Sequence, residues 1–449
     1  MINFALTRKM HNLRRHHNYI MNFNILNLLF FLLFGYIQAF PAIPVDERQA
    51  GAQYFAYPVP RYGVPPLSPY PEGYEPFHLE HYGRHGSRWN LGEKDFARAV
   101  DYLQKAEKHN ALSSRGKELL TQLKSMALDA DGHAGEMTPL GYRQHEGIAQ
   151  RMFENFPELF SGYTYLNAKS TESKRCILSM NKEVEVLKGL SPGLIVCQGS
   201  PKNYQDILNP NGNDLVSKRL WEEARPVAES YRKSLPEPDA FFDILFTDRN
   251  FVREALGEEN VFKAIFELAV NVQSHDNYRF FYDIFSKDEL LNEWKARNAE
   301  WYVRFGNTPI TSNRTFFNQS VLLKNIIESA DSAMLSSKKS INLRFGHDLM
   351  LLPLSVLMEL DDAAYETSDL SSLADKWHCQ DFFPMAGNIQ MVFFRPSNGP
   401  YKLDDILVKV LLNEHEARLS VESVHGNYYR WTDLRNHYLL KLQNMPQIR

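Results

Sequence analysis

The chain has 449 residues, 44% of them hydrophobic and 13% aromatic, which is enough to bury a large core in two or three structural units. Its formal net charge of −4 excludes a global basic field of the kind that attracts nucleic acid. The three cysteines, Cys176, Cys197 and Cys379, have no zinc-ligand spacing, and their odd number leaves at least one thiol without a disulfide partner.

The N-terminal segment, residues 1–42, has the composition of an export signal. Basic residues precede the apolar stretch 25–34, small residues follow at Ala39 and Ala42, and Met21 is an alternative start. The apolar stretch is shorter than the ~20 residues of a membrane-spanning helix, which favours cleavage over a retained anchor. We therefore expect a secreted or periplasmic protein that meets the membrane only through its signal.

A lead-in rich in Pro and Tyr, residues 43–76, precedes the first predicted strand at 77–82. Three helices are predicted next, at about 93–109, 114–128 and 139–155. The third is well marked, because Thr138 is a typical N-cap residue and Pro139 suits the first helical position.

Strand and helix signals then alternate around a long helical block. The predicted segments are a strand at 163–168, a helix ending near 189, a helical block at 205–335, a strand at 341–345, a helix at 349–360, and strands at 389–395 and 406–412. This order predicts an α/β domain of three layers, built from 77–204 and 336–449, with 205–335 inserted as a helical cap.

The strongest chemical signal is the run Arg84-His85-Gly86-Ser87-Arg88, which directly follows a predicted strand. Guanidinium groups fit the oxygens of a phosphoryl group, and an imidazole between them is placed to attack phosphorus. The glycine lets the backbone approach closely. The alternative is a basic surface loop, which two neighbouring glycines at a strand end disfavour.

These five residues resemble the signature of the histidine phosphatase superfamily, and the rest of the chain resembles its acid phosphatase/phytase branch, which includes multiple inositol polyphosphate phosphatases. Three further segments are similar to that branch: Met137–Gly141, Lys169–Arg175 and Gly346–Asp348. The resemblance implies a phosphoglycerate mutase-like α/β/α sandwich with a helical cap, an acidic pH optimum, and no metal or cofactor requirement.

By the same resemblance, His85 is the nucleophile that becomes phosphorylated, while Arg84, Arg88 and His347 bind the substrate phosphate. Asp348 protonates the leaving alcohol and then activates water. An alkoxide leaves poorly, so a nearby carboxylic acid contributes ~10²–10⁴-fold to the rate. The ordinary alternative for the His-Asp pair is a turn in which the aspartate caps the following helix.

Two departures from the family pattern stand out. Lys169 occupies the place of a third phosphate-binding arginine, and lysine keeps the charge but loses the bidentate fork. Arg175, one helical turn later, offers a second cation, although in the family that position looks structural. In addition, the closest inositol polyphosphate phosphatases usually have His-Ala-Glu where this chain has His347-Asp348.

Three functions remain open. The first is an exported hydrolase of small phosphate monoesters, such as inositol or sugar phosphates; the second is a phosphoryl-transferring mutase. The third is a non-catalytic phosphate-ligand binder, motivated by Lys169. His81 and Tyr82 precede the signature, and we favour an ordinary strand role over one in the pocket. Substrate choice and oligomeric state are not encoded in a readable pattern.

Overall fold

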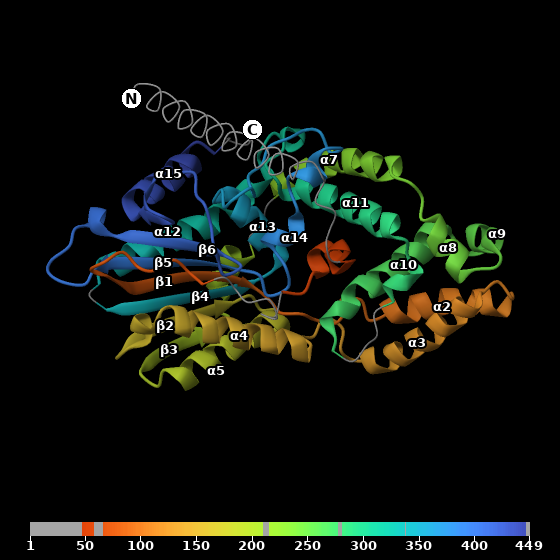
Figure 1. The fold of residues 1–449 in the computed structure, drawn as a ribbon, viewed down its shortest axis with the longest axis horizontal. Coiled ribbons are helices and arrows are strands. Elements are labelled where there is room, and N and C mark those ends of the chain that lie inside the picture. The colour runs from red at the N-terminus through yellow and green to blue at the C-terminus, as the bar shows by residue number, and fades with distance from the viewer. Residues whose placement is uncertain (1–46, 58–65, 210–214, 277–280, 337, 446–449) are drawn as a thin grey trace, which may run out of the picture. The chain divides into compact units, whose positions relative to one another are not determined.

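Nine strands form one mixed sheet in the computed structural model, which describes residues 47–57, 66–209, 215–276, 281–336 and 338–445 (Figure 1). The strand order is β3-β2-β4-β1-β5-β6-β9-β8, and β7 pairs with β6. The strands are β1 (Tyr74–Arg84), β2 (Thr164–Ser170), β3 (Leu194–Gly199), β4 (Lys339–Gly346), β5 (Asn388–Pro396), β6 (Leu407–Leu412), β7 (His415–Glu416), β8 (Ser423–His425) and β9 (Tyr428–Arg430).

The centre of the sheet brings the three predicted motif strands together. β4 lies between β1 and β2 and runs parallel to both, with Arg84 opposite Gly346 and Ser170 opposite Phe345. Strand β5 pairs with the other edge of β1 and runs antiparallel to it. Because the carboxyl ends of parallel strands meet at one edge, the loops that follow β1, β2 and β4 are neighbours there.

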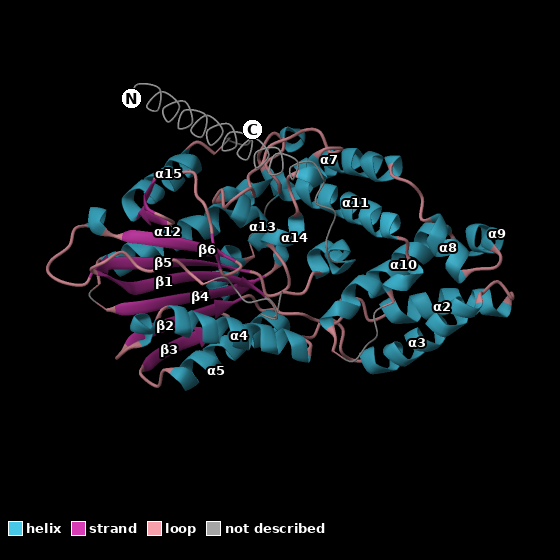
Figure 2. Ribbon diagram, in the orientation of Figure 1, coloured by secondary structure: helices cyan, strands magenta, loops and turns pink. Residues whose placement is uncertain are grey.

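Helices cover both faces of the sheet, which confirms the predicted three-layer α/β/α architecture (Figure 2). Apolar side chains of α4 and α5 pack on one face, and those of α12, α13 and α15 pack on the other. The helices are α2 (Asp95–Lys108), α3 (Ser114–Ala130), α4 (Pro139–Asn155), α5 (Lys174–Leu190), α6 (Gln205–Leu208), α7 (Leu215–Ser234), α8 (Asp239–Leu245), α9 (Arg249–Phe251), α10 (Glu258–Asn271), α11 (Lys287–Phe305), α12 (Ser320–Met334), α13 (Asp348–Leu357), α14 (Cys379–Phe382) and α15 (Trp431–Gln443).

Local sequence signals set several of these boundaries. The Thr138 hydroxyl accepts a hydrogen bond from the Gly141 amide, and Pro139 opens α4, as predicted. Strand β3 and the three short strands after β6 were not predicted. β3 lies at the edge of the sheet and has mostly exposed or half-buried residues, so it lacks the apolar run that marks a central strand.

A second hydrophobic core lies among helices rather than on the sheet. It joins α2 and α3 with α8, α10 and α11, and these helices lie together beyond one end of the strands in Figure 1. The predicted cap range, 205–335, differs from this packing at both ends. Helices α2 and α3 precede that range, whereas α12 lies within it and packs against the sheet. A helix's residues do not reveal which neighbour its apolar face will meet.

Some predictions fall outside the described residues. The export signal, 1–42, is one of them, and so is part of the lead-in. Among the helices that are described, none combines the length and the hydropathy that crossing a bilayer requires. All three cysteines are free thiols; Cys176 and Cys379 are buried, and Cys197 is exposed.

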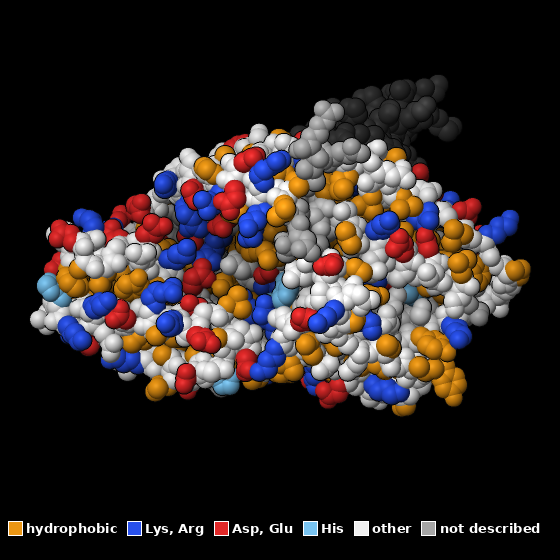
Figure 3. Space-filling model, turned by 180° about the vertical axis from the view of Figure 1, so that it is seen from behind, with side chains coloured by type: hydrophobic (Ala, Val, Ile, Leu, Met, Phe, Trp, Pro, Cys, Tyr) orange, Lys and Arg blue, Asp and Glu red, His pale blue; other side chains and the backbone are white. Residues whose placement is uncertain are grey.

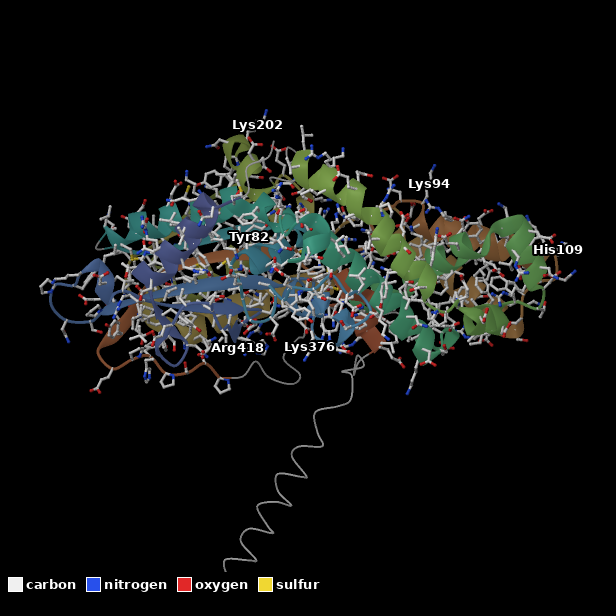
Figure 4. All side chains as sticks on the ribbon, turned by 90° about the horizontal axis from the view of Figure 1, so that it is seen from above. Tyr82, Lys94, His109, Lys202, Lys376 and Arg418 are labelled. Carbon is white, nitrogen blue, oxygen red and sulfur yellow. The ribbon has the colours of Figure 1, made fainter. Side chains whose placement is uncertain are left out.

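Side-chain placement follows the layers. Tyr82, labelled in Figure 4, lies in the interior beside the sheet, whereas the labelled Lys94 and Lys202 project at the surface. Acidic and basic side chains are interspersed over the face shown in Figure 3, in keeping with the small net charge.

One buried charge is tied into the middle of the sheet. Glu80 is 1% exposed and accepts hydrogen bonds from His78, Ser329 and Asn342, at 2.8, 2.6 and 2.7 Å, as well as from Arg344. Burial alone raises the pKa of Glu80, but the Arg344 guanidinium and the hydrogen-bond donors lower it from 4.5 to about 2. The network therefore stabilises the fold above pH 4.5 and loses that contribution as the pH falls toward 2.

We expect Glu80→Gln to lower the free energy of unfolding by about 3–5 kcal/mol at neutral pH, because it leaves the buried Arg344 without its counter-charge. Urea denaturation between pH 2 and pH 7 measures this, and the loss should shrink toward pH 2. Glu75→Gln is the matched control, since the Glu75–Arg395 pair is partly exposed and worth about 1 kcal/mol or less. Equal losses in both variants would contradict the assignment.

Candidate active site

Backbone hydrogen bonds hold the signature loop at the end of β1. The His85 amide donates to the Gly346 carbonyl at 3.1 Å, and the Arg84 amide donates to Gly387 at 2.8 Å. The His85 carbonyl in turn accepts from the Ala386 amide at 2.9 Å. The loop is thus tied to the segments that follow β4 and precede β5, which fixes the position of the His85 ring.

Two glycines allow the signature loop to meet the start of α4. A Cβ on Gly86 would lie 2.7 Å from the Gly141 Cα, and a Cβ on Gly141 would lie 2.3 Å from the Ser87 carbonyl oxygen. Real side chains do not reach such distances. The close approach explains physically why the segment Met137–Gly141 accompanies the signature in the sequence, since Thr138 also donates to Ser87.

His85 is held neutral with one nitrogen free to react. Its side chain is buried, and Nδ1 lies 3.0 Å from the Gly86 carbonyl oxygen. A carbonyl can only accept, so Nδ1 carries the proton and Nε2 carries the lone pair. Burial, followed by the positive charge of the neighbouring arginines, holds the pKa of His85 well below its ordinary value.

Arg84 links this loop to the loop after β4. It is fully buried, and its guanidinium donates to the Phe383 carbonyl at 2.6 Å and to Asp348 Oδ2 at 2.7 Å. The other carboxylate oxygen of Asp348 accepts the Leu349 amide at 2.9 Å, as a residue at a helix start commonly does. Burial raises the pKa of Asp348, but the Arg84 charge outweighs it and the pKa is lowered overall.

Three guanidinium groups, of Arg84, Arg88 and Arg175, lie close enough to His85 for their charges to lower its pKa. Arg88 donates to the Trp89 carbonyl at 2.9 Å and lies 5.5 Å from the Tyr54 ring centre, while Arg175 contacts His347. Within the described residues, the buried Nε atoms of Arg84, Arg88 and Arg175 have no hydrogen-bond acceptor. Three positive charges against the single carboxylate of Asp348 make this an oxyanion site.

His347 faces His85, and the two ring centres are 5.6 Å apart. Arg175 Nη2 lies 3.3 Å from His347 Nδ1, and a guanidinium can only donate, so Nδ1 is the acceptor and Nε2 carries the proton. Burial, followed by the Arg175 charge, lowers the pKa of His347 to about 4. Nε2 lies 3.4 Å from Thr171 Oγ1, and an anion that enters the site would compete with this long contact for its N–H.

The structure corrects the placement of Lys169. It is opposite Arg344 in the sheet, and its ammonium contacts Cys197 Sγ at 3.7 Å on the side away from buried Ala168 and Ser170. Successive strand residues point to opposite faces, so Lys169 does not join the cluster. Arg175 supplies the third guanidinium instead, although its position looked structural from the sequence.

The remaining predicted site residues come together at one edge of the sheet. Arg84 is the last residue of β1, His85 and Arg88 follow it, and His347 and Asp348 follow β4. His81 is buried against the Phe345 ring, 5.2 Å between centres, with no hydrogen-bond partner for either ring nitrogen among the described residues, and Tyr82 donates to the Leu208 carbonyl at 3.5 Å. No sequence signal marked Tyr54, which reaches Arg88 from the lead-in. Among the described residues, no group of His, Cys, Asp and Glu side chains is placed to hold a metal ion.

No protein-family model and no curated protein sequence matches the chain. Solved structures do. The multiple inositol polyphosphate phosphatase of Bifidobacterium longum in complex with phosphate is 16% identical, with a TM-score of 0.69 over 87% of this chain and 97% of that chain. The phytase from D. castellii is 14% identical, with a TM-score of 0.62 over 89% and 86%. The resemblance expected from the sequence is therefore confirmed at the level of the fold.

We expect Arg175→Ala to weaken binding of inorganic phosphate by about tenfold or more, because it removes a charge-assisted donor from a buried site. Isothermal titration at pH 6 measures this. Lys169→Ala removes the same charge from the same β2–α5 region and should change the dissociation constant less than twofold. A larger effect from Lys169 than from Arg175 would reverse the assignment.

Gly141→Ala should destabilise the protein by about 1–3 kcal/mol and weaken phosphate binding, because its Cβ must push the Ser87 carbonyl and with it the signature loop. Thermal denaturation and phosphate titration measure the two effects. Gly189→Ala, near the end of α5, meets no heavy atom within 4 Å and should be neutral or slightly stabilising. If the two variants behaved alike, the close contact would not be what positions the loop.

Proposed function

We propose that this chain, which has the fold of the histidine acid phosphatases, hydrolyses phosphate monoesters through a phosphohistidine intermediate on His85. The observation that carries the proposal is the arrangement around that ring. A neutral imidazole whose Nε2 carries the lone pair lies near three arginines that have unused donors among the described residues, and the Asp348 carboxylate accepts a hydrogen bond from one of them, Arg84.

In the first step, the three guanidinium groups and His347 bind the non-bridging oxygens of the substrate phosphate. The His85 Nε2 lone pair forms a bond to phosphorus, and the bond from phosphorus to the ester oxygen breaks. The ester oxygen takes the electron pair of the broken bond and receives a proton from Asp348. The leaving group therefore departs as a neutral alcohol. The arginines stabilise the charge that is spread over the oxygens in the transition state.

In the second step, Asp348, now a carboxylate, removes a proton from water. The water oxygen bonds to phosphorus, the phosphorus–nitrogen bond of the phosphohistidine breaks, and inorganic phosphate is released. The hydrogen bond from Nδ1 to the Gly86 carbonyl is retained throughout, so that His85 returns to its starting tautomer. Asp348 ends the cycle protonated, as it began.

The charges of the site account for the direction of the pH dependence. In the free protein, Arg84 holds Asp348 ionised. A bound phosphate competes for Arg84 and adds negative charge, so the pKa of Asp348 rises in the complex. His85 stays neutral in acid because its pKa is well below the ordinary value. Turnover should therefore increase as the pH falls from neutral into the acidic range.

Phosphate esters of inositol are the first substrates to test. The Bifidobacterium longum protein with the same fold is a multiple inositol polyphosphate phosphatase and has been solved with inositol hexasulfate, and the D. castellii protein is a phytase. Sugar phosphates are the second class. Arg175 provides the guanidinium that Lys169 cannot. The lysine at position 169 is therefore no longer a reason to propose a protein that binds phosphate without hydrolysing its esters. The composition of residues 1–42 supports export, to the periplasm or the medium.

We expect the protein from residue 43 onward to release phosphate from p-nitrophenyl phosphate between pH 3 and pH 7 with a chelator present, and His85→Ala to abolish this release. Asp348→Asn should lower kcat by about 10²–10⁴-fold for glycerol 2-phosphate, whose alkoxide needs a proton. The loss should be smaller for p-nitrophenyl phosphate, whose leaving group is more acidic.

Three results would contradict the proposal. One is phosphate release that survives in His85→Ala, and another is the transfer of phosphate to an added acceptor sugar as the main product, which indicates a mutase. The third is a folded wild-type protein that binds phosphate but hydrolyses none of these esters. Trapping of ³²P in wild type but not in His85→Ala after an alkaline quench, in which the phosphorus–nitrogen bond survives, tests the intermediate directly.

A further inference from the structure

Gln144, on the second turn of α4, directs its side-chain amide at the backbone of the signature loop. It is 3% exposed, and its Oε1 accepts a hydrogen bond from the Ser87 amide at 2.8 Å. A backbone amide can only donate, so the atom of Gln144 that faces it is the oxygen. Nε2 makes a long contact, 3.5 Å, with the Tyr57 carbonyl. Gln144 therefore acts on the loop through one buried hydrogen bond.

The Ser87 amide shares a peptide unit with the carbonyl that binds the His85 ring. The Gly86 carbonyl and the Ser87 N–H belong to one planar trans peptide, so they point in opposite directions. On one side the carbonyl accepts the proton of His85 Nδ1 at 3.0 Å, and on the other the N–H donates to Gln144. The groups form one hydrogen-bonded chain in which each bond polarises the next. The orientation of the ring is thus coupled to that of the Gln144 amide.

This peptide unit needs an anchor outside the loop. Glycine has no Cβ, so rotation about the Gly86 backbone is less restricted than at other residues. The preceding peptide is held separately, since the Gly86 amide donates to Ser179 Oγ at 3.2 Å. That bond does not fix the Gly86 carbonyl, because rotation about the Cα–C bond of Gly86 turns the carbonyl and leaves the amide in place. Gln144 holds the other end of the same plane and so stabilises the orientation of the carbonyl.

Helix α4 gives Gln144 a fixed position. Its first turn touches the loop at Gly141, where a Cβ would lie 2.3 Å from the Ser87 carbonyl oxygen. Next to Gln144, His145 Nδ1 lies 2.7 Å from Glu183 Oε1 of α5, and both side chains are buried. A shift of α4 would break this buried contact as well as the one with the loop. The acceptor of the Ser87 amide is therefore preorganised.

We propose that Gln144 is a positioning residue that selects the reactive tautomer of His85, acting through the Gly86–Ser87 peptide. The inference rests on the proposed function and deepens it. A neutral imidazole has two tautomers, and only the one with its proton on Nδ1 leaves the Nε2 lone pair for phosphorus. The Gly86 carbonyl favours that tautomer, and Gln144 keeps the carbonyl in place. Loss of Gln144 therefore lowers the reactive fraction of His85 while the guanidinium groups still bind phosphate.

The experiment reads the tautomer directly in the free protein. Wild type, Gln144→Met, Gln144→Glu and the control Gln273→Met are labelled with ¹⁵N-histidine. Two-bond ¹H–¹⁵N correlation spectra at pH 6 then distinguish Nδ1–H from Nε2–H rings, and His85→Ala identifies the His85 signals. Gln273, just beyond the end of α10, is also buried, and its Oε1 accepts the Ala56 amide at 2.9 Å. Its replacement by methionine removes the same kind of bond from a different peptide.

We expect His85 to be an Nδ1–H ring in wild type, in Gln144→Glu, which keeps an oxygen acceptor, and in Gln273→Met. In Gln144→Met it should become a mixture or an Nε2–H ring. The kcat of Gln144→Met for p-nitrophenyl phosphate should fall by about tenfold or more, because the tautomer of a histidine that reacts is then no longer fixed. Its dissociation constant for inorganic phosphate should change less than about threefold, because the charge-assisted donors are untouched.

An Nδ1–H ring in folded Gln144→Met, or the same change of tautomer in Gln273→Met, would overturn the inference. Thermal denaturation establishes that each variant is folded. If Gln144→Met does not fold, Gln144→Asn takes its place, since its shorter side chain withdraws the acceptor from the Ser87 amide. A wild type whose tautomer depends on Gln144 but that hydrolyses no ester would refute the proposed function and leave the role of Gln144 in positioning His85 standing.

Discussion

The concentration of positive charge around His85 is the constraint on which the site depends. Three guanidinium groups are brought into a largely buried space with only the Asp348 carboxylate to oppose them, and each keeps a buried Nε without an acceptor among the described residues. Such an arrangement is unfavourable in an empty protein. The same arrangement is suited to an anion, because the donors are already oriented. Burial, followed by this positive charge, holds the pKa of His85 well below its ordinary value, so the ring stays neutral.

The fold tolerates this charge because the backbone around it is fixed from several directions. Parallel pairing of β1 with β4 places Arg84 beside Gly346, and the loops that follow exchange amide–carbonyl hydrogen bonds with each other and with the segment before β5. The mutual approach of Gly86 and Gly141 adds a contact with α4 that no side chain would permit. Behind the site, the Glu80–Arg344 network ties the central strands to α12.

Chemistry and recognition come from different parts of the chain. The residues that we assign to bond making and breaking all follow strands of the central sheet. Outside these strand ends, the lead-in contributes Tyr54, which lies against Arg88, and the helices α2, α3, α8, α10 and α11 share a core of their own. Such a division lets a cap vary in the ligands it accepts while the strand ends keep a constant geometry for phosphoryl transfer.

The sequence by itself determined the alternation of strands and helices, the cap of α4 at Thr138, and the signature Arg84–Arg88, because these depend on local propensity and on contiguous residues. It also implied that the His-Asp pair would meet that signature, through resemblance and through the convergence of strand ends. Only the tertiary structure decided that α2 and α3 pack with the cap helices and that Arg175 rather than Lys169 enters the site. The physical reason is that the alternation of a strand and the turn of a helix decide which side a residue takes, whereas the neighbour on that side is decided by elements far away in the chain.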